Sequence, residues 1–385
     1  MSQHWMERME AHVLGVIEDR RRGTSAAILR VVLRQFSYLY GAVVQLRLSL
    51  FHWGILRPHT LGCQVLSVGN LTVGGTGKTP VVEAFARALQ QRGRKVAILS
   101  RGYKKRNPPL GRRFRQALSG RPADPLVVSD GRRLLLDSAI GGDEPFMLAS
   151  NLPEVAVIVG KDRVRSGQYA IRKLGCDTLI LDDGFQYLAL KHRMDIVLVD
   201  RTNPFGNRRL LPRGILREPI RNIRRAGFIF ITKSNGDGAE ALREDLRRMN
   251  PEAEISECRH CARHLEGVFT RVRHPLDDLR GRDVAAVSGI AMPKSFEDEL
   301  ARLGARVRYH KRYTDHHRYT QQEIIDVINR GIERDATAVI TTEKDAVRFP
   351  RMDRCDLPVL FLRVEIEMLS GEDAFHDWIE RLCFR

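Results

Sequence analysis

The feature that most constrains this chain is a glycine-rich loop between a short apolar run and a helical pattern. The run 65–68 reads as a buried strand, and residues 81–92 have helical periodicity. Between them lies Gly74-Gly-Thr-Gly-Lys-Thr79. Strand, Gly-rich loop, Gly-Lys-Thr and helix follow one another in this order in phosphate-binding loops, where backbone N–H groups and the helix dipole bind phosphate. The sequence therefore predicts a nucleoside-triphosphate site.

The loop also indicates which residues would act in that site. Lys78 can reach the β- and γ-phosphates, and the Thr79 hydroxyl can ligate Mg²⁺. The strict pattern requires glycine where this chain has Thr72, and the glycines do not form the G-x-G-x-x-G of dinucleotide sites. The predicted nucleotide-binding residues are Thr72, Val73, Gly74, Gly75, Thr76, Gly77, Lys78 and Thr79.

Two acidic segments downstream are candidates for chemistry. The apolar run 178–181 ends in Asp182-Asp183, where a carboxylate would ligate Mg²⁺ beside the phosphates; an ordinary Asp-Gly turn is the alternative. The pattern does not say which of the two aspartates would contact the metal. Asp143 precedes a helical stretch, so it is either the N-cap of that helix or a base for a substrate hydroxyl in phosphoryl transfer.

Histidine, arginine and cysteine supply weaker signals. His316, within Asp315-His-His317, belongs either to a metal cluster or to a loop of solvated histidines. Arg217 lies in a loop that contains Pro and Gly, and its guanidinium could bind a phosphate through two hydrogen bonds. The alternative, and the more usual case, is an arginine that is simply exposed on the surface. Cys258 and Cys261 have no second cysteine pair at zinc-site spacing, so we expect reduced thiols.

Residues 26–56 form an apolar stretch with a thin polar stripe. Small or polar residues recur every three or four positions, as they would along one side of a helix. Arginines interrupt the run of about 20 apolar residues that a membrane-spanning helix needs. A helix lying in the bilayer interface and a helix packing on the domain behind it both fit this pattern. The stripe consists of Arg30, Arg34, Ser37, Gly41 and Gln45.

Composition narrows the class of protein. A hydrophobic fraction of 43% and a charged fraction of 29% exclude a disordered, collagenous or polytopic membrane protein. Six cysteines in 385 residues do not make a disulfide scaffold and indicate a reducing compartment. A net charge of +17 favours phosphate-bearing or otherwise anionic partners. An aromatic content of 7% without clustering argues against nucleic acid.

Apolar strands alternate with helical stretches, which predicts an α/β fold with a phosphate-loop NTPase-like parallel sheet and a second, smaller α/β domain. We expect an N-terminal extension with the amphipathic helix (1–60), a phosphate-loop core domain (61–236) and a C-terminal α/β lobe (237–385). This division places Asp143 and His316 in different lobes, so that lobe closure would join them. The expected strands are 65–68, 96–99, 155–159, 178–181, 196–199, 228–231, 284–287, 338–341 and 359–362.

Taken together, these segments resemble the tetraacyldisaccharide 4'-kinase family, the lipid A 4'-kinases of Gram-negative envelope synthesis. The resemblance runs from about Phe36 to the C-terminal region, and Thr72 is normal for that family. Tyr187, where the family commonly has His, the insertion 108–124 and the extension 1–22 depart from it. The matching blocks are 67–80, 100–103, 128–131, 142–145, 182–186, 204–207, 210–212, 216–219, 232–235, 288–291, 315–317 and 341–345.

The resemblance implies transfer of the γ-phosphate of ATP to the 4'-hydroxyl of a tetraacyldisaccharide 1-phosphate, with ATP and Mg²⁺ as cofactors. It makes Asp143 the general base and His316 its partner, while Lys78 and Arg217 neutralise charge on the transferring phosphoryl group. The implied magnesium-side residues are Thr79, Asp183, Glu144, Gln186 and Asp182, and the implied substrate-contacting residues are Tyr103 and Arg217.

The resemblance also implies a place in the cell. In that family the N-terminal helix enters the membrane surface. We therefore expect a peripheral or monotopic protein on the cytoplasmic face of the bacterial inner membrane. The expected partners are the lipid A precursor and an anionic membrane surface, and not nucleic acid. The alternative is a phosphate-loop ATPase or GTPase that acts as a switch or assembly factor at the membrane. The segment 232–235 faintly resembles a guanine-reading motif but lacks its first Asn and last Asp.

Overall fold

The structure, a computed structural model, describes residues 15–17, 19, 21–102 and 124–384. Contacts divide the chain into two compact units, one of residues 1–101, 162–259 and 368–385, and one of residues 102–161 and 260–367. These boundaries differ from the expected ones at 60 and 236. The expectation that Asp143 and His316 lie in different lobes is wrong, because both belong to the second unit.

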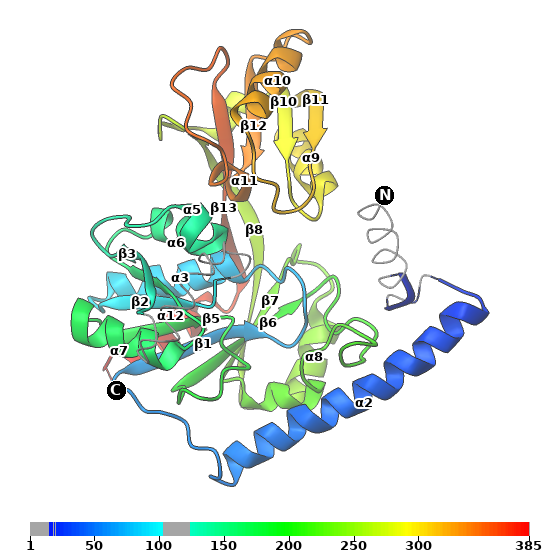
Figure 1. Ribbon diagram of the computed structural model, residues 1–385, viewed down its shortest axis with the longest axis vertical. Helices are drawn as coiled ribbons and strands as arrows, with labels where there is room; N and C mark the ends of the chain where they lie inside the picture. Colours follow the sequence, from blue (N-terminus) through cyan, green and yellow to red (C-terminus); the bar gives the residue numbers. More distant parts are fainter. Residues whose placement is uncertain (1–14, 18, 20, 103–123, 385) are drawn as a thin grey trace, which may run out of the picture. The chain divides into compact units, whose positions relative to one another are not determined.

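The first unit is built on a parallel sheet (Figure 1). Its strands are buried on both faces, as is usual for parallel strands between helices. Val68 pairs with Asp182, so the ends of β1 and β5 lie side by side at one edge. In spatial order the strands are β2 (Val96–Ser100), β5 (Thr178–Asp182), β1 (Gln64–Asn70), β6 (Met194–Asp200), β7 (Phe228–Thr232) and the start of β8 (Glu254–Gly267).

An aromatic cluster packs the C-terminal helix into the first unit. Phe85, on α3, lies edge-to-face against Phe375 and Trp378, with ring centroids 4.9 and 5.7 Å apart. Because such rings bury large apolar surfaces, this cluster explains why residues 368–385 belong to the first unit. The helices of this unit include α3 (Lys78–Gln91), α7 (Arg163–Leu174), the 3-10 helix η1 (Ile220–Arg225), α8 (Glu240–Met249) and α12 (Glu372–Phe384).

The second unit contains a parallel sheet in the order β11-β10-β12-β13 and an antiparallel pair, β3 and β4. The short helix α11 packs against α6, which brings the segment after β12 next to the start of α6. The strands are β3 (Leu126–Asp130), β4 (Ala156–Val159), β9 (Arg273–His274), β10 (Asp283–Ser288), β11 (Arg306–Arg312), β12 (Ala338–Thr342) and β13 (Val359–Ser370). The helices are α5 (Ser138–Gly141), α6 (Asp143–Asn151), the 3-10 helix η2 (Leu276–Leu279), α9 (Pro293–Arg302), α10 (Gln321–Ile332) and α11 (Glu343–Ala346).

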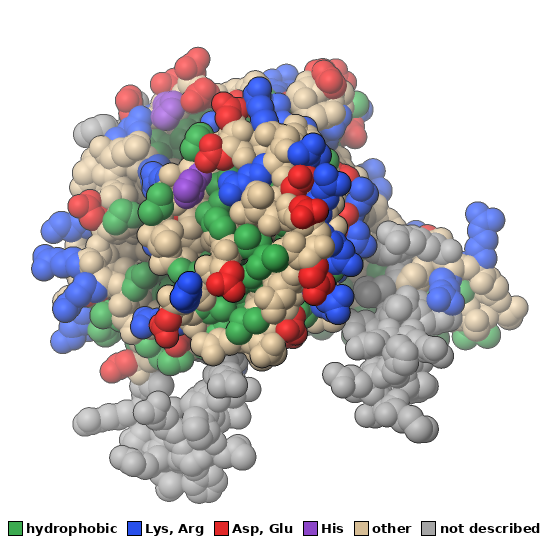
Figure 2. Space-filling model, turned by 90° about the horizontal axis from the view of Figure 1, so that it is seen from above, with side chains coloured by type: hydrophobic (Ala, Val, Ile, Leu, Met, Phe, Trp, Pro, Cys, Tyr) green, Lys and Arg blue, Asp and Glu red, His purple; other side chains and the backbone are tan. Residues whose placement is uncertain are grey.

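The α/β fold class is confirmed, and each of the nine expected strands is present. Four further strands, β3, β8, β9 and β11, were not expected. In β11 the exposed arginines meet acidic partners, since Arg306 and Arg308 both pair with Asp283. On the described part of the face in Figure 2, basic side chains are likewise interspersed with acidic ones.

Helix α2 (Thr24–His52) runs along the outside of the first unit (Figure 1). Ser37 and Gly41 are buried against the protein, and a Cβ atom on Gly41 would lie 2.7 Å from Leu210 Cδ1. The middle of the thin stripe therefore faces the protein core. Many apolar side chains of α2 point outward, and those more than half exposed include Ile28, Val31, Phe36, Leu39, Val43 and Leu46.

Among the described residues, α2 alone is long and apolar enough to cross a membrane, by length and composition. Its most apolar 18-residue window has a mean hydropathy of 1.3, and 11% of that window is buried. Both interpretations of the sequence pattern thus have support. The helix packs on the domain through one narrow stripe and leaves a broad apolar face uncovered.

Candidate functional site

The loop after β1 has the backbone that its glycines predict. Gly74 and Gly77 have φ angles of +114° and +76°, a region that L side chains rarely adopt. The carbonyl of Thr76 accepts a hydrogen bond from the Thr232 hydroxyl at 2.9 Å, which ties the loop to the end of β7. Helix α3 begins at Lys78 and has no side-chain cap at its N-terminus. The predicted anion-binding arrangement of loop and helix N-terminus is therefore present.

Thr72 lies inside the protein, at the start of the loop. The Asn70 amide donates to the Thr72 carbonyl at 2.8 Å and lies 3.3 Å from its hydroxyl. Lys78 Nζ lies 3.4 Å from Asn70 Oδ1. Asn70 was not among the predicted site residues, although it lies in the quoted block 67–80. It holds the loop and the lysine in place from the end of β1.

Three predicted residues from distant segments meet around one carboxylate. Arg217 Nη1 lies 2.8 and 2.7 Å from the two oxygens of Asp183, and Lys78 Nζ lies 3.5 Å from one of them. Gln186 Oε1 lies 3.4 Å from Arg217 Nη1. Burial by itself would raise the pKa of Asp183, but the charges of Lys78 and Arg217 outweigh it and hold that pKa below its ordinary value. The carboxylate is therefore ionised at neutral pH.

The two neighbouring aspartates have different surroundings. Asp182 is buried, and its Oδ2 accepts a hydrogen bond from the Ser100 hydroxyl at 3.0 Å. The Asp183 side chain is about one third exposed. Asp183 also has a φ of +55°, which is uncommon for a residue other than glycine and is typical of functional sites. A ligand arriving from solvent can reach Asp183 more readily than Asp182.

Four side chains in and beside the loop offer oxygen donors for a metal. The Thr79 hydroxyl, the carboxylates of Asp182 and Asp183 and the Gln186 carbonyl are the hard ligands that Mg²⁺ prefers. Within the described residues no group of three or more His, Cys, Asp or Glu could hold a metal ion. Mg²⁺ typically takes one or two carboxylates and completes its shell with phosphates and water. Glu144 belongs to the second unit and pairs there with Lys344 at 3.1 Å.

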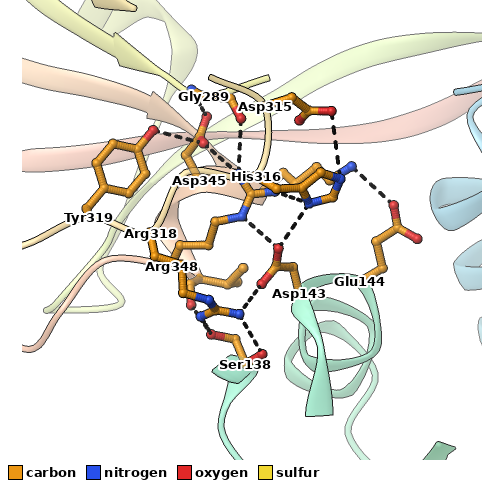
Figure 3. A network of polar contacts seen from close by, with 12 residues as sticks. Ser138, Asp143, Glu144, Gly289, Asp315, His316, Arg318, Tyr319, Asp345 and Arg348 are labelled. Atoms are coloured by element: carbon orange, nitrogen blue, oxygen red, sulfur yellow. Dashed lines mark hydrogen bonds and ion pairs between the residues drawn. The ribbon is translucent and has the colours of Figure 1, made fainter. Parts of the chain in front are cut away.

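A second polar cluster, in the second unit, surrounds Asp143 (Figure 3). Gly142, and not Asp143, is the N-cap of α6, so the capping interpretation of Asp143 is wrong. The carboxylate instead accepts hydrogen bonds from Arg348 Nε at 2.7 Å and from Arg318 Nη2 at 2.9 Å, and it lies 3.3 Å from His316 Nδ1. The sequence-predicted pair of Asp143 and His316 is therefore brought together.

His316 is held by backbone and side-chain contacts. Its N–H donates to the Gly289 carbonyl at 3.1 Å, and its φ is +65°. Its Nδ1 also lies 3.2 Å from Arg348 Nη2. A protonated Nδ1 donates to Asp143, and an unprotonated one accepts from Arg348, so the proton on this atom selects the partner. The solvated-loop interpretation is wrong for His316, whose side chain is 19% exposed.

Sequence reasoning missed Arg348, which is fully buried. Its Nη1 donates to the Gly289 carbonyl and to Asp345 Oδ1, both at 3.1 Å. Asp345 in turn accepts from the Tyr319 hydroxyl at 3.0 Å. Arg348 lies three residues beyond the matching block 341–345, and no local pattern marked it. It fixes the Asp143 carboxylate from inside the protein.

The pKa of Asp143 reflects these neighbours. Burial by itself would raise it, but the hydrogen bond with His316 and the positive charges of Arg348 and Arg318 outweigh burial and hold the pKa below the ordinary value of an aspartate. Asp143 is therefore ionised at neutral pH. A positioned carboxylate in this state can accept a proton from a hydroxyl or orient it.

The remaining predictions concern Tyr103, the insertion 108–124 and the two cysteines of 258–261. Tyr103 lies outside the described residues, as does the insertion except for Asp124. Cys258 and Cys261 are free cysteines on β8, as expected of reduced thiols. Burial raises the pKa of Cys258 to about 12, so this thiol stays protonated at neutral pH.

Comparisons with known proteins agree on one family. The family model for the tetraacyldisaccharide-1-P 4'-kinase matches residues 29–383. A tetraacyldisaccharide 4'-kinase of Anaeromyxobacter dehalogenans is 42% identical over 340 residues, 87% of this chain and 86% of the relative. One of Halothermothrix orenii is 34% identical over 365 residues, 92% of this chain and 91% of the relative. The crystal structure of LpxK from Aquifex aeolicus in complex with ATP matches with a TM-score of 0.72 and 29% identity, covering 92% of this chain and 100% of that one.

Proposed function

Since the chain belongs to the tetraacyldisaccharide-1-P 4'-kinase family, we infer that it transfers the γ-phosphate of ATP to the 4'-hydroxyl of a tetraacyldisaccharide 1-phosphate. One observation supports the roles that we assign to individual residues in this reaction. The chain has two separate polar clusters, one with a phosphate-binding loop and two cations, and one with an ionised carboxylate held by three side chains. A kinase needs both kinds of group, one for the phosphates and one for the acceptor hydroxyl.

The phosphate cluster would act on the nucleotide. The loop from Thr72 to Thr79 would surround the β- and γ-phosphates, and Lys78 and Arg217 would neutralise the charge that spreads over the transferring group. Thr79, Asp183 and Gln186 would hold Mg²⁺, with Asp182 as a further carboxylate at the end of β5. Bound Mg²⁺ would supply electrostatic stabilisation of the phosphate oxygens.

The carboxylate cluster would act on the acceptor. Asp143 would accept the proton of the 4'-hydroxyl as the new bond from oxygen to phosphorus forms and the bond to the ADP oxygen breaks. His316, at 3.3 Å, would orient Asp143 and shift its proton affinity. Arg348 and Arg318 would hold the two oxygens of Asp143 in a single orientation.

A transfer assay tests this function. Purified protein, Mg-ATP and a radiolabelled tetraacyldisaccharide 1-phosphate in detergent micelles should yield the 4'-phosphorylated lipid. A nucleotide switch would need no group such as Asp143 and would hydrolyse nucleotide without a lipid product. ATP or GTP hydrolysis without phosphate transfer would therefore replace the kinase assignment with the switch.

We also propose that α2 binds the bilayer interface and does not cross the bilayer. Its inner face is bonded to the protein at Ser37 and Tyr40, so that side is not available to lipid. Its outer side chains are apolar, with Arg34 and Arg47 exposed among them. Apolar side chains with interspersed cations are typical of helices that lie in an anionic interface. ATP as substrate would place this interface on the cytoplasmic face of the inner membrane.

Replacing Leu39 with glutamate should weaken vesicle binding by about tenfold or more. Burial of one leucine contributes about 1.5–3 kcal/mol, and the new charge resists entry into the interface. The measurement is cosedimentation with vesicles containing anionic lipid. Gln35→Glu is the matched control, since it adds the same charge at an exposed polar position and removes no apolar side chain. Equal binding by both variants would exclude the apolar face of α2 as the contact.

Replacing Arg318 with glutamine should shift the acid limb of the kcat/KM profile to higher pH. Arg318 helps to depress the pKa of Asp143, so its loss raises that pKa and protonates the base at a higher pH. Because the Arg318 side chain is partly exposed, solvent screens its charge, and we expect the shift of the acid limb to be small. Arg330→Gln, an exposed arginine of α10, controls for the change in net charge. An unchanged acid limb in Arg318→Gln would show that another group titrates there.

A further inference from the structure

The inner face of α2 forms hydrogen bonds with the segment 210–217, which contains Arg217. The Ser37 hydroxyl donates to the Leu210 carbonyl at 2.5 Å and accepts from the Arg213 N–H at 3.1 Å. The Tyr40 hydroxyl donates to the Arg217 carbonyl at 2.9 Å. Burial raises the pKa of Tyr40, so this hydroxyl stays a neutral donor. We refer to Ser37 and Tyr40 as the α2 brace.

The same segment is bonded on its other side to the phosphate-binding loop. The Arg217 N–H donates to the Leu71 carbonyl and the Val73 N–H donates to the Ile215 carbonyl, both at 2.7 Å. Thr72 and Leu216 form a β-bridge. The segment 210–217 thus lies between α2 and the loop, with hydrogen bonds to both.

The backbone of Arg217 is therefore held on two sides, by Leu71 at its N–H and by Tyr40 at its carbonyl. Its guanidinium reaches Asp183. Because the two backbone contacts fix the peptide groups on either side of the Cα atom, they set the direction in which this side chain leaves the chain. A small displacement of a group that stabilises a transition state lowers the rate strongly.

We propose that the α2 brace positions Arg217 for phosphoryl transfer, so that Tyr40 is a positioning residue of the kinase. This proposal rests on the proposed function and adds a second role to α2. The outer face of the helix would bind lipid while its inner face supports the phosphate site. The two roles use different side chains of one helix and are separable by substitution.

Tyr40→Phe is the primary test, made in the full-length enzyme in detergent micelles with Mg-ATP and the disaccharide 1-phosphate. It removes one hydroxyl and keeps the ring. We expect kcat to fall about 3- to 10-fold, the range that one net hydrogen bond supports, with a smaller change in the KM for ATP. Tyr38→Phe is the matched control, because Tyr38 is an exposed tyrosine of the same helix whose hydroxyl bonds only to Arg34 among the described contacts. It should leave kcat unchanged.

A double-mutant cycle separates positioning from general stabilisation. In an Arg217→Ala background, Tyr40→Phe should have no further effect on kcat, since its effect passes through the Arg217 side chain. An undiminished effect of Tyr40→Phe in that background would overturn the proposal, as would a wild-type kcat in Tyr40→Phe alone. Vesicle binding should be the same in Tyr40→Phe and the wild type.

Failure of the proposed kinase function can be distinguished from failure of the α2 brace. If the wild type hydrolyses ATP but phosphorylates no lipid, the kinase assignment fails, and the same cycle is then measured on the hydrolysis rate. Arg217 would act on the same phosphoryl group in that reaction, so coupling between Tyr40 and Arg217 would still support the brace. Additive effects on hydrolysis would refute it.

Discussion

Asp143→Asn should lower kcat by about 10²- to 10³-fold, which is the scale of lost general-base catalysis. Asparagine keeps the size of the side chain and an oxygen that can accept from Arg348, so the contacts that place residue 143 are mostly kept. What it loses is the negative charge and the ability to accept a proton. The measurement is steady-state transfer to the lipid acceptor at saturating Mg-ATP.

The depressed pKa of Asp143 does not conflict with this role. A weak base removes protons poorly in the ground state, but the transition state of phosphoryl transfer is loose, and the attacking hydroxyl loses its proton late. Early in the reaction the carboxylate therefore acts mainly by orienting the hydroxyl. The proton moves to Asp143 only when the new bond to phosphorus makes the hydroxyl acidic.

Asp326→Asn is the control for this experiment. Asp326 is exposed on α10, in the same unit, and bonds to Gln322. Its substitution makes the same chemical change without touching either polar cluster, so it should leave kcat at the wild-type value. Full activity in Asp143→Asn would show that Asp143 is not the base, and His316 would then be the candidate for that role.

Lys78→Met should lower kcat/KM by about 10²- to 10³-fold, comparable to the loss of one preorganised donor in other active sites. Methionine fills much of the same space but cannot neutralise charge on the phosphates. Arg217 would remain with Asp183, so the acidic side chain would keep one cationic partner and the fold should be unaffected. The measurement is kcat and the KM for ATP from transfer assays over a range of ATP concentrations.

The matched control is Lys173→Met, an exposed lysine at the end of α7 in the same unit. It removes one positive charge from a protein of net charge +17, as Lys78→Met does. If both variants lost activity equally, the loss would reflect overall charge and not the contact with phosphate. If Lys78→Met kept wild-type kcat/KM, the loop would not serve as the nucleotide site.

The nucleotide side of the site could be predicted because it is local in sequence. The strand, the loop and the start of α3 lie within 64–91, and each glycine and Lys78 has a role that this spacing alone implies. The carboxylates at the end of β5 could be predicted for the same reason, since an apolar strand precedes them. In such segments the chemistry and the backbone that presents it are encoded together.

The acceptor side could not be predicted to the same extent. His316 and Arg348 are distant from Asp143 in the chain and reach it through contacts between α6, α11 and the loop after β11. No local pattern encodes such contacts. The residues made Asp143 and His316 candidates and the family resemblance paired them, but neither indicated the two arginines that hold the carboxylate.

The missed strands have a related cause. In β11 the sequence Arg306-Val-Arg-Tyr-His-Lys-Arg312 lacks an apolar run, because the strand carries basic side chains whose partners, Asp283 and Glu297, lie on other elements. The boundaries of the two compact units differ from the expected ones for a similar reason. The residues that make α12 part of the first unit, Phe375 and Trp378, are recognisable as core residues only when Phe85 is seen beside them.

Helix α2 reverses the usual relation between hydrophobicity and tolerance to mutation. In most helices of globular proteins the apolar positions determine folding stability, and the small or polar positions vary freely. Here the small residue Gly41 and the hydroxyls of Ser37 and Tyr40 contact the protein, while Leu39 and Val43 face outward. Apolar-to-apolar changes on the outer side should therefore be nearly neutral for folding. A single methyl group at position 41 would disturb the packing against Leu210. The smallest possible increase in side-chain size, from glycine to alanine, should therefore destabilise the fold more than an apolar-to-apolar change on the outer side of the helix.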